Sequence, residues 1–311
     1  MKEISIEMSP CKSPESTQKL FPNKSYLQSA KPILKEHVSE STADTYHSFQ
    51  FECRLQIIST INPRLTYQDE ILHHLKKKEE VLKIISTKSI LEKHKITADF
   101  RAKMVDWIIE VTSKAECTSQ TLFLSVAILD RFLQNSRTSY KNSNLHLIGV
   151  VSMLLASKFE EIQGMDIGFM YSQVVHKKIS EKEMADFEIR LFEDLQFAVL
   201  SPTEYEFVEV YCESLGEGLG NVLAQALYIA ILNLHSVELA GIKPSLRAAA
   251  NLFISIKESL VLSSKQTLKK LSFMSGASEE EVEETAKRIE DHRRDFKKLY
   301  PKLKNAINYA Q

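Results

Sequence analysis

The chain has 311 residues, of which 43% are hydrophobic, and it contains only 8 glycines and 8 prolines. This length allows two domains, and the scarcity of turn residues argues against an all-β fold, so we predict an all-α protein. Forty Lys and Arg residues balance 41 Asp and Glu residues, giving a formal net charge of −1. That balance provides no broad attraction to nucleic acid or to an anionic membrane, and we expect neither as a partner.

The cysteines and the hydropathy pattern argue against two further classes. Cys11, Cys53, Cys117 and Cys212 are far apart and show no C-x-x-C spacing, so we expect neither a disulfide framework nor a metal site. No apolar run reaches the ~18 residues that a membrane-spanning helix needs. The first residues also lack the apolar core of a signal peptide. We therefore expect an intracellular protein.

The composition changes twice along the chain. The first part is rich in Ser, Lys, Glu and Pro, which cannot bury enough apolar surface to offset the entropy of ordering. The next part has helical periodicity but stays charged, as in ILHHLKKKEEVLKII, which suits a helix lying on the surface of something larger. The predicted segments are a disordered tail at 1–46, a helical extension at 47–96, a first unit at 97–198, a second unit at 199–297 and a C-terminal tail at 298–311.

Ten apolar helices joined by short polar segments are predicted from residue 97 onward. Ser180, Thr203 and Ser278 each precede a Glu by three residues, the spacing of a capping box at a helix start. The corner at 198–202 divides the helices five and five, which predicts two similar units in tandem. The helices are predicted at 99–114, 119–134, 144–160, 167–176, 181–194, 203–214, 221–239, 245–258, 264–273 and 279–296.

The stretch FRAKMVDWIIEV, residues 100–111, is apolar on nearly every side and yet contains Arg101 and Asp106. Such a helix is enclosed, and an arginine removed from water is costly unless an acid and further hydrogen bonds meet it. Asp130, in AILDRFL on the next predicted helix, also has apolar surroundings on several sides. We therefore predict a buried Arg101–Asp130 pair that fixes the register of the first two helices.

Four stretches resemble, in order and nearly in spacing, the cyclin box of cell-cycle cyclins. They are FRAKMVDWIIEV, TLFLSVAILDRFL, LHLIGVVSMLLASKFEEI and FEIRLFEDLQFAVLSPTEYEF. The resemblance covers about residues 97 to 260. It implies tandem five-helix cyclin folds preceded by an N-terminal helix, which agrees with the helix count above. In that family, the positions of Arg101 and Asp130 form a buried pair.

The resemblance also implies a function. Cyclins form heterodimers with a cyclin-dependent serine/threonine kinase and activate it without doing chemistry, so we expect no enzymatic activity and no cofactor. The box is most similar to the mitotic A/B group, which implies a G2/M role and a location in the nucleus and cytoplasm. Two alternatives stay open, a transcription-associated cyclin and a cyclin-fold scaffold without kinase activation. An enzyme is disfavoured because Glu160 and Glu161 are adjacent and diverge by about 100° on a helix, so they cannot flank one substrate bond.

By resemblance, the kinase would contact the end of the third helix and the fifth helix. Lys158 and Glu188 would grip it beside its mobile regulatory helix, and Phe159, Glu161 and Leu191 are expected neighbours in that contact. Docking would hold the kinase helix inward and complete the Lys–Glu pair that positions the ATP phosphates. The segment QGMDIG, which follows KFEEI, lacks the proline that is usual in the family. The spacing between Lys158 and Glu188 is also one residue longer than in the family pattern.

A second implied site is the hydrophobic groove that captures Arg-x-Leu motifs of substrates and inhibitors. Lys103 stands where an apolar residue normally lines this groove, and a cation there should repel an arginine-bearing peptide. We therefore expect weakened docking. The sequence contains no Arg-x-x-Leu, Lys-Glu-Asn or Leu-x-Cys-x-Glu motif. The implied groove residues are Phe100, Lys103, Met104, Trp107, Glu110, Leu145 and His146.

Overall fold

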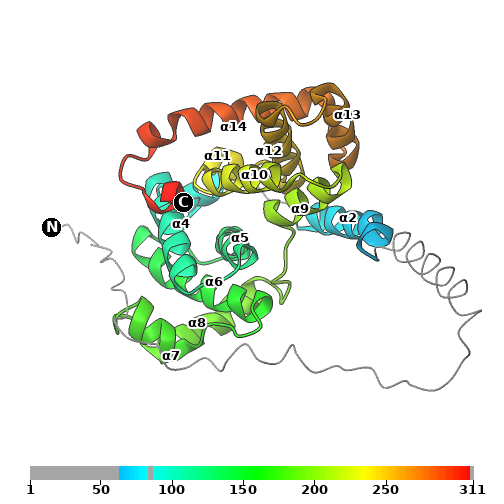
Figure 1. The fold of residues 1–311 in the computed structure, drawn as a ribbon. Helices are drawn as coiled ribbons and strands as arrows, with labels where there is room; N and C mark the ends of the chain where they lie inside the picture. Colours follow the sequence, from blue (N-terminus) through cyan, green and yellow to red (C-terminus); the bar gives the residue numbers. More distant parts are fainter. Residues whose placement is uncertain (1–62, 83–86, 309–311) are drawn as a thin grey trace, which may run out of the picture. The chain divides into compact units, whose positions relative to one another are not determined.

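A computed structural model of the chain describes residues 63–82 and 87–308. Gln68–Gln311 form one compact unit. The predicted disordered tail, 1–46, and residues 47–62 of the predicted extension lie outside the described residues. Throughout the described ranges, every regular element is a helix, which confirms the all-α prediction (Figure 1).

Two helices precede the first predicted unit, α2 (Pro63–Val81) and α3 (Thr87–Lys93). On α2, the buried Leu75 belongs to the hydrophobic core of the second unit. The Glu79 carboxylate accepts hydrogen bonds from the Ser245 amide at 2.8 Å and from its hydroxyl at 2.7 Å. Through Leu75 and Glu79, α2 therefore packs against the chain's own second unit.

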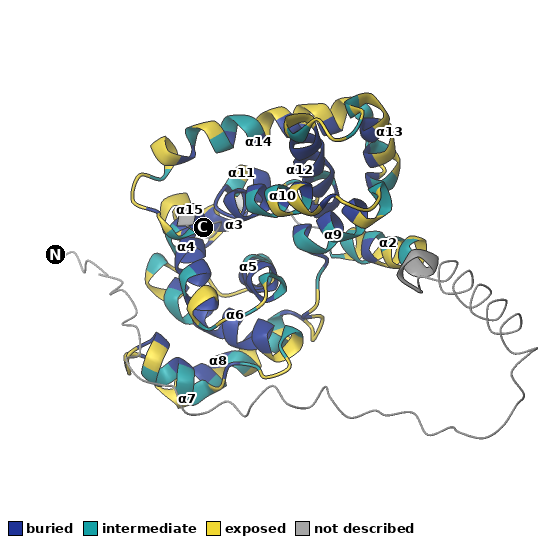
Figure 2. Cartoon of the chain, viewed as in Figure 1, coloured by how far each residue is buried: buried dark blue, intermediate teal, exposed yellow. Residues whose placement is uncertain are grey.

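The first unit is built around helices that are apolar on several sides. α5 contacts α3, α4, α6 and α8, and α6 contacts α4, α5 and α8. Because these two helices have neighbours on most sides, their apolar residues do not form a single stripe (Figure 2). The elements are α4 (Ala98–Lys114), α5 (Ser119–Asn135), the 3-10 turn η1 (Asn142–Asn144), α6 (Leu145–Glu160), α7 (Ile167–Phe169), the π-helix η2 (Met170–Val174) and α8 (Glu181–Asp194).

The second unit is arranged around α12, which contacts α9, α10, α13 and α14. Ala248, Ala249 and Ala250 on α12 are fully buried, and such small side chains let neighbouring helices approach closely (Figure 2). The elements are α9 (Glu204–Leu215), α10 (Gly220–Asn233), α11 (Val237–Ala240), α12 (Pro244–Ser259), α13 (Ser264–Ser275), α14 (Glu279–Leu299) and α15 (Asn305–Asn308). The third long helix of each unit, α6 or α12, is thus its most enclosed element.

Two details differ from the sequence-based prediction. The helix predicted at 221–239 is interrupted after Asn233, and Ser236 starts the short helix α11 by accepting a hydrogen bond from the Leu239 amide at 3.2 Å. The predicted C-terminal tail, 298–311, is in part folded. Leu303 and Ala306 are buried, and α15 packs against α4 and α10.

Candidate functional site

The predicted Arg101–Asp130 pair is present and buried. Arg101 is 1% exposed, and its Nε and Nη2 donate to the two carboxylate oxygens of Asp130 at 2.8 and 2.6 Å. Its Nη1 donates to the Leu234 carbonyl at 2.9 Å, which ties the pair to the second unit. Burial by itself would lower the pKa of Arg101, but the charge and hydrogen bonds of Asp130 outweigh it and the net shift is upward. The guanidinium therefore stays charged and fully bonded.

The second unit contains a comparable pair that the sequence analysis missed. Arg247 on α12 donates from Nε to Glu204 Oε2 at 2.7 Å and from Nη1 to the Leu239 carbonyl at 2.7 Å. The other oxygen of Glu204 accepts from Asn233 at 2.9 Å and from Asn251 at 2.5 Å. The signal in the sequence is the same as for Arg101, an arginine beside the small apolar residues of RAAANLF in a helix that is otherwise buried.

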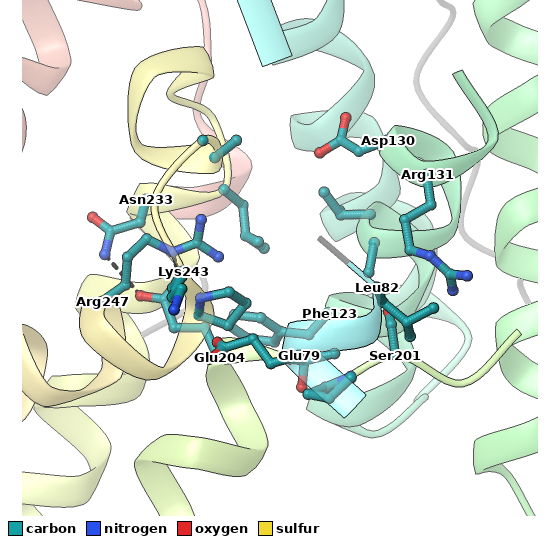
Figure 3. Close-up of a pocket in the computed structure, with 18 of the residues that line it drawn as sticks. Glu79, Leu82, Phe123, Asp130, Arg131, Ser201, Glu204, Asn233, Lys243 and Arg247 are labelled. Carbon is teal, nitrogen blue, oxygen red and sulfur yellow. Dashed lines mark hydrogen bonds and ion pairs between the residues drawn. The ribbon is translucent and has the colours of Figure 1, made fainter. Parts of the chain in front are cut away.

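Both ion pairs line one cavity of 370 Å³. Figure 3 shows Asp130 and Arg131 on one side of it, and Asn233, Glu204 and Arg247 on the other. Arg131 is buried and donates to the Val199 carbonyl at 3.1 Å, and burial lowers its pKa. Since each of these charged groups already has a partner within the chain, their arrangement indicates a structural role. The bonds from Arg101 to Leu234 and from Arg131 to Val199 join the two units, whereas the Arg247–Glu204 pair lies within the second.

The residues predicted to bind a kinase lie at the end of α6 and on α8. Lys158 Nζ lies 2.6 Å from Glu188 Oε1, and the Lys158 side chain is 46% exposed. Beside this ion pair, the rings of Phe159, Phe192 and Phe197 form an aromatic row, with centroid separations of 6.4 and 6.0 Å. Phe159 is 46% and Phe197 74% exposed. An exposed ion pair next to exposed aromatic rings is a composition typical of a protein-binding surface.

Two of the predicted kinase contacts have roles inside the chain. Glu161 Oε1 accepts from the Thr118 amide at 2.7 Å and from the Thr121 hydroxyl at 2.5 Å, so it caps the start of α5. Burial would raise the pKa of Glu161, but these hydrogen bonds lower it overall. Leu191 has no exposed surface. Its side chain belongs to the core of the first unit, and its place next to the kinase contact stays a prediction.

The predicted groove residues come together where α4 meets α6. Met104, Trp107 and Leu145 are at most 7% exposed and form its floor, while Phe100 at its edge is 37% exposed. The His146 ring lies 4.8 Å from the Trp107 ring. α4 and α6 approach closely at Gly149, because a Cβ added there would lie 2.4 Å from the Met104 sulfur.

Lys103 lies at the groove, but its charge has a partner. Its Nζ is 2.6 Å from Asp99 Oδ2 and 5.2 Å from the centre of the Phe100 ring. Glu110 forms a similar pair with Lys114, with Lys114 Nζ 2.6 Å from Glu110 Oε1. A cation from a peptide would therefore meet carboxylates that already have a lysine neighbour.

Asp106, the second charged residue in the apolar stretch of α4, is held by the end of the described chain. Its oxygens accept from the Asn305 side chain at 2.9 Å and from the Ala306 amide at 3.2 Å. His235 Nε2 lies 3.7 Å from Asp106 Oδ1. The sequence analysis named Asp106 as unusual but found no partner for it.

The described residues were also searched for metal-binding groups and for membrane-spanning helices. No group of three or more His, Cys, Asp and Glu side chains among them could hold a metal ion. None of the helices in the described ranges is long and apolar enough to cross a membrane.

Comparison with protein families gives two matches that together span most of the chain. The model described as "Cyclin, N-terminal domain" matches residues 70–200, and the model described as "Cyclin, C-terminal domain" matches residues 202–307. The boundary between the matches falls in the corner at 198–202 that divides the ten predicted helices. The first match contains Lys158, Glu188 and the groove on α4.

Individual relatives agree with these matches. The chain is 30% identical over 224 residues to a G2/mitotic-specific cyclin-B of Patella vulgata, covering 71% of this chain and 52% of that protein. It is 28% identical to G2/mitotic-specific cyclin-B1 of Xenopus laevis, covering 63% and 48%. The chain thus spans about half the length of the curated relatives it matches. Among solved structures, a viral cyclin from herpesvirus saimiri has the same fold, with a TM-score of 0.63, 20% identity and coverage of 71% of this chain and 96% of that one.

Proposed function

The chain belongs to the cyclin family, and from this premise we propose that it is a regulatory subunit that binds and activates a cyclin-dependent serine/threonine kinase. The observation that carries the proposal is the exposed Lys158–Glu188 ion pair beside the aromatic row of Phe159, Phe192 and Phe197. It lies on the surface where the family resemblance puts the kinase. The chain itself does no chemistry in this role.

The proposed mechanism is a shift of a conformational equilibrium in the kinase. The aromatic row supplies apolar surface to bury, and Lys158 and Glu188 supply one donor and one acceptor group for the kinase backbone. Contact with this surface favours the kinase conformation whose regulatory helix points inward, and that position completes the ion pair that orients the ATP phosphates. Binding free energy is thereby converted into activation.

We place the proposed role in cell division, at the G2/M transition, and in the nucleus and cytoplasm. Support for the cell-cycle role comes from the relatives, which are named as G2/mitotic-specific cyclins at about 30% identity. A transcription-associated cyclin is the alternative, and a scaffold that does not activate a kinase is another. The three roles differ in which kinase is bound and in whether it becomes active.

The test is affinity capture of the tagged chain from its own cells, scored by the kinase that co-purifies and by phosphate transfer to histone. The wild-type chain is expected to recover an active kinase. The Lys158→Ala/Glu188→Ala variant is expected to recover at least about tenfold less, because central interface residues carry most of the binding energy. A matched control is Glu258→Ala/Arg293→Ala, which removes an ion pair on the second unit.

Each outcome separates the alternatives. Recovery of a cell-cycle kinase by wild type and by the control, but not by the Lys158/Glu188 variant, supports the proposal and the predicted surface. Recovery of a transcriptional kinase favours the first alternative. A kinase that is bound but inactive favours the scaffold. Equal recovery by all three proteins would place the kinase contact elsewhere.

We also propose that the groove on α4 docks peptides of the Arg-x-Leu type weakly. The exposed part of Phe100 supports it, since a leucine side chain could pack against this ring at the edge of the groove. The pairing of Asp99 with Lys103, and of Glu110 with Lys114, supports the weakness, because the peptide's arginine must compete with lysines for these carboxylates.

A further inference from the structure

Four charged residues of α4 form a stripe next to the groove floor. Asp99, Lys103, Asp106 and Glu110 follow the spacing i, i+4, i+7 and i+11, which places them on one side of the helix. The same spacing, one position later, is shared by Phe100 at the groove edge, by the floor residues Met104 and Trp107, and by buried Val111. The two stripes therefore run along neighbouring sides of the helix. We call the first of these the charged wall of the groove.

The charged wall has three carboxylates, and the chain supplies a donor to each of them. Asp99 is paired with Lys103, and Glu110 with Lys114. Asp106 receives its donors from residues 303–308, which we call the α15 segment. Its side chain is only 9% exposed while that segment lies against it.

Asn305 makes the central contact of the α15 segment. Its side-chain amide lies 2.9 Å from Asp106 Oδ2, 3.2 Å from the Asp106 carbonyl oxygen and 3.5 Å from Glu110 Oε2. The Ala306 amide donates to Asp106 Oδ1 at 3.2 Å, and Ala306 is fully buried. One neutral amide group therefore lies between two carboxylates, in the position that a cation would favour.

The bonds between the α15 segment and Asp106 could be displaced by a cationic ligand. The bonds that Asn305 and Ala306 make to Asp106 join a neutral donor to a carboxylate, whereas a guanidinium would bring a positive charge of its own to the same oxygens. Among the residues of the α15 segment whose side chains the structure describes, the buried hydrophobic ones are Leu303 and Ala306. A cation that reached Asp106 and Glu110 would thus make stronger bonds than the ones it displaced.

We propose that the α15 segment is an intrachain competitor for the charged wall, and that Asn305 decides whether the groove accepts an arginine-bearing peptide. With the segment in place, Asp106 is covered and Glu110 is partly engaged, so such a peptide binds mainly through its apolar residue. When the segment leaves, both carboxylates can pair with the arginine. This inference rests on the proposed docking groove and not on the proposed kinase surface.

The test is fluorescence anisotropy with two synthetic peptides, one carrying an Arg-x-Leu motif and one with citrulline in place of the arginine. In the full chain, Asn305→Ala is expected to tighten the arginine peptide about three- to tenfold, the worth of one to two hydrogen bonds. The affinity for the citrulline peptide should change little in Asn305→Ala. Asn305→Lys is expected to weaken the arginine peptide, because it places a tethered cation beside Asp106. The matched control is Gln266→Ala, which removes an exposed amide side chain on α13 in the second unit.

A second measurement follows the segment itself. Hydrogen exchange of the Ala306 amide should become faster when the arginine peptide is added to the wild-type chain, because the peptide displaces the segment from Asp106. Unchanged affinity in Asn305→Ala, or an equal gain for the arginine and citrulline peptides, would overturn the inference. Failure of every variant to bind either peptide would also overturn it, while the kinase capture would still report on the proposed function.

Discussion

Arg101 can be buried because each nitrogen of its guanidinium has an acceptor. Asp130 accepts from two of them and the Leu234 carbonyl from the third. A buried ion pair adds little net stability, because the cost of removing two charges from water nearly cancels their attraction. Loss of one partner is different, since it leaves an uncompensated charge in the core. The pair is thus better understood as a constraint on how α4, α5 and the second unit fit together.

The charge of Lys103 is expected to weaken binding of an arginine-bearing peptide to the groove. Lys103→Ile is expected to tighten binding of an Arg-x-Leu peptide about threefold or more, because the change frees Asp99 and removes a like charge worth on the order of 1 kcal/mol. Anisotropy titrations at low and high salt measure it, and the gain should shrink at high salt because surface charges are screened.

The control for this change is Lys287→Ile, which removes an exposed lysine on α14 in the second unit. It should leave peptide binding unchanged at both salt concentrations. If Lys103→Ile fails to tighten the peptide, or tightens it equally at all salt concentrations, then repulsion by Lys103 does not limit docking.

How far the site could be predicted depends on where the partner of each residue lies. Asp130 could be assigned to Arg101 because both are charged residues in apolar helices close in sequence. The partners of Asp106 could not, since Ala306 lies 200 residues away in a segment without a distinctive pattern. Leu191 was predicted by resemblance to be a neighbour in the kinase contact, and its burial is explained by the spacing i, i+3, i+7 that it shares with Met184 and Phe187 on α8.

Helix starts were the elements most accurately predicted. Thr203 and Ser278 each form the expected reciprocal capping box with the Glu three residues later. These contacts are local, so the sequence is sufficient to specify them. The break between α10 and α11 was missed although Ser236, the N-cap of α11, is a residue type that favours helix starts. Buried His235 and the Arg101 bond to the Leu234 carbonyl occur at that break, and both depend on the tertiary fold.

The contact between α4 and α6 depends on one glycine. Gly149→Ala would improve intrinsic helix propensity by about 1 kcal/mol. However, its new methyl group would lie 2.4 Å from the buried Met104 sulfur, and overpacking of a core costs about 1–3 kcal/mol. We expect a net loss of stability in urea unfolding, of about 1 kcal/mol.

A double-mutant cycle separates these two effects. In a Met104→Ala background the side chain that clashes is absent, so Gly149→Ala should become stabilising by about 1 kcal/mol through helix propensity alone. Stabilisation by Gly149→Ala in the wild-type background would show that Met104 moves aside at no cost. The close approach of α4 and α6 would then not require the glycine.

At the scale of the whole molecule, the two cyclin folds share buried polar contacts as well as apolar surface. Arg101 bonds across to Leu234, and Asp106 lies near His235. On the second fold, His235 and His292 both pack against the rings of Phe296 and Tyr300, with centroid separations from 5.2 to 5.9 Å. Five helices per fold were predicted from periodicity, and that prediction missed the break between α10 and α11. The histidine cluster joins residues of α14 to the turn before α11, so it could not be predicted from either segment alone.

His292 makes the stability of this cluster depend on pH. It is 9% exposed, and neither ring nitrogen has a hydrogen-bond partner among the described residues. Burial, with a smaller contribution from the charge of His235, lowers the pKa of His292 from 6.5 to about 4. Between these pH values the unfolded chain binds a proton at this residue and the folded chain does not. The stability is therefore complete above pH 6.5 and falls as the pH is lowered toward 4, by about 3 kcal/mol from this group.

Urea unfolding at a series of pH values across this window measures the effect. Other groups also titrate there, so the prediction concerns the difference between variants. His292→Phe keeps an aromatic ring in the cluster and removes the titrating group, and its stability should fall less steeply with decreasing pH than that of the wild-type chain. His73→Gln, a change at an exposed histidine of α2, should keep the wild-type slope. Identical slopes for wild type and His292→Phe would mean that His292 is protonated as easily in the folded chain as in the unfolded one, through water entering between α14 and α11.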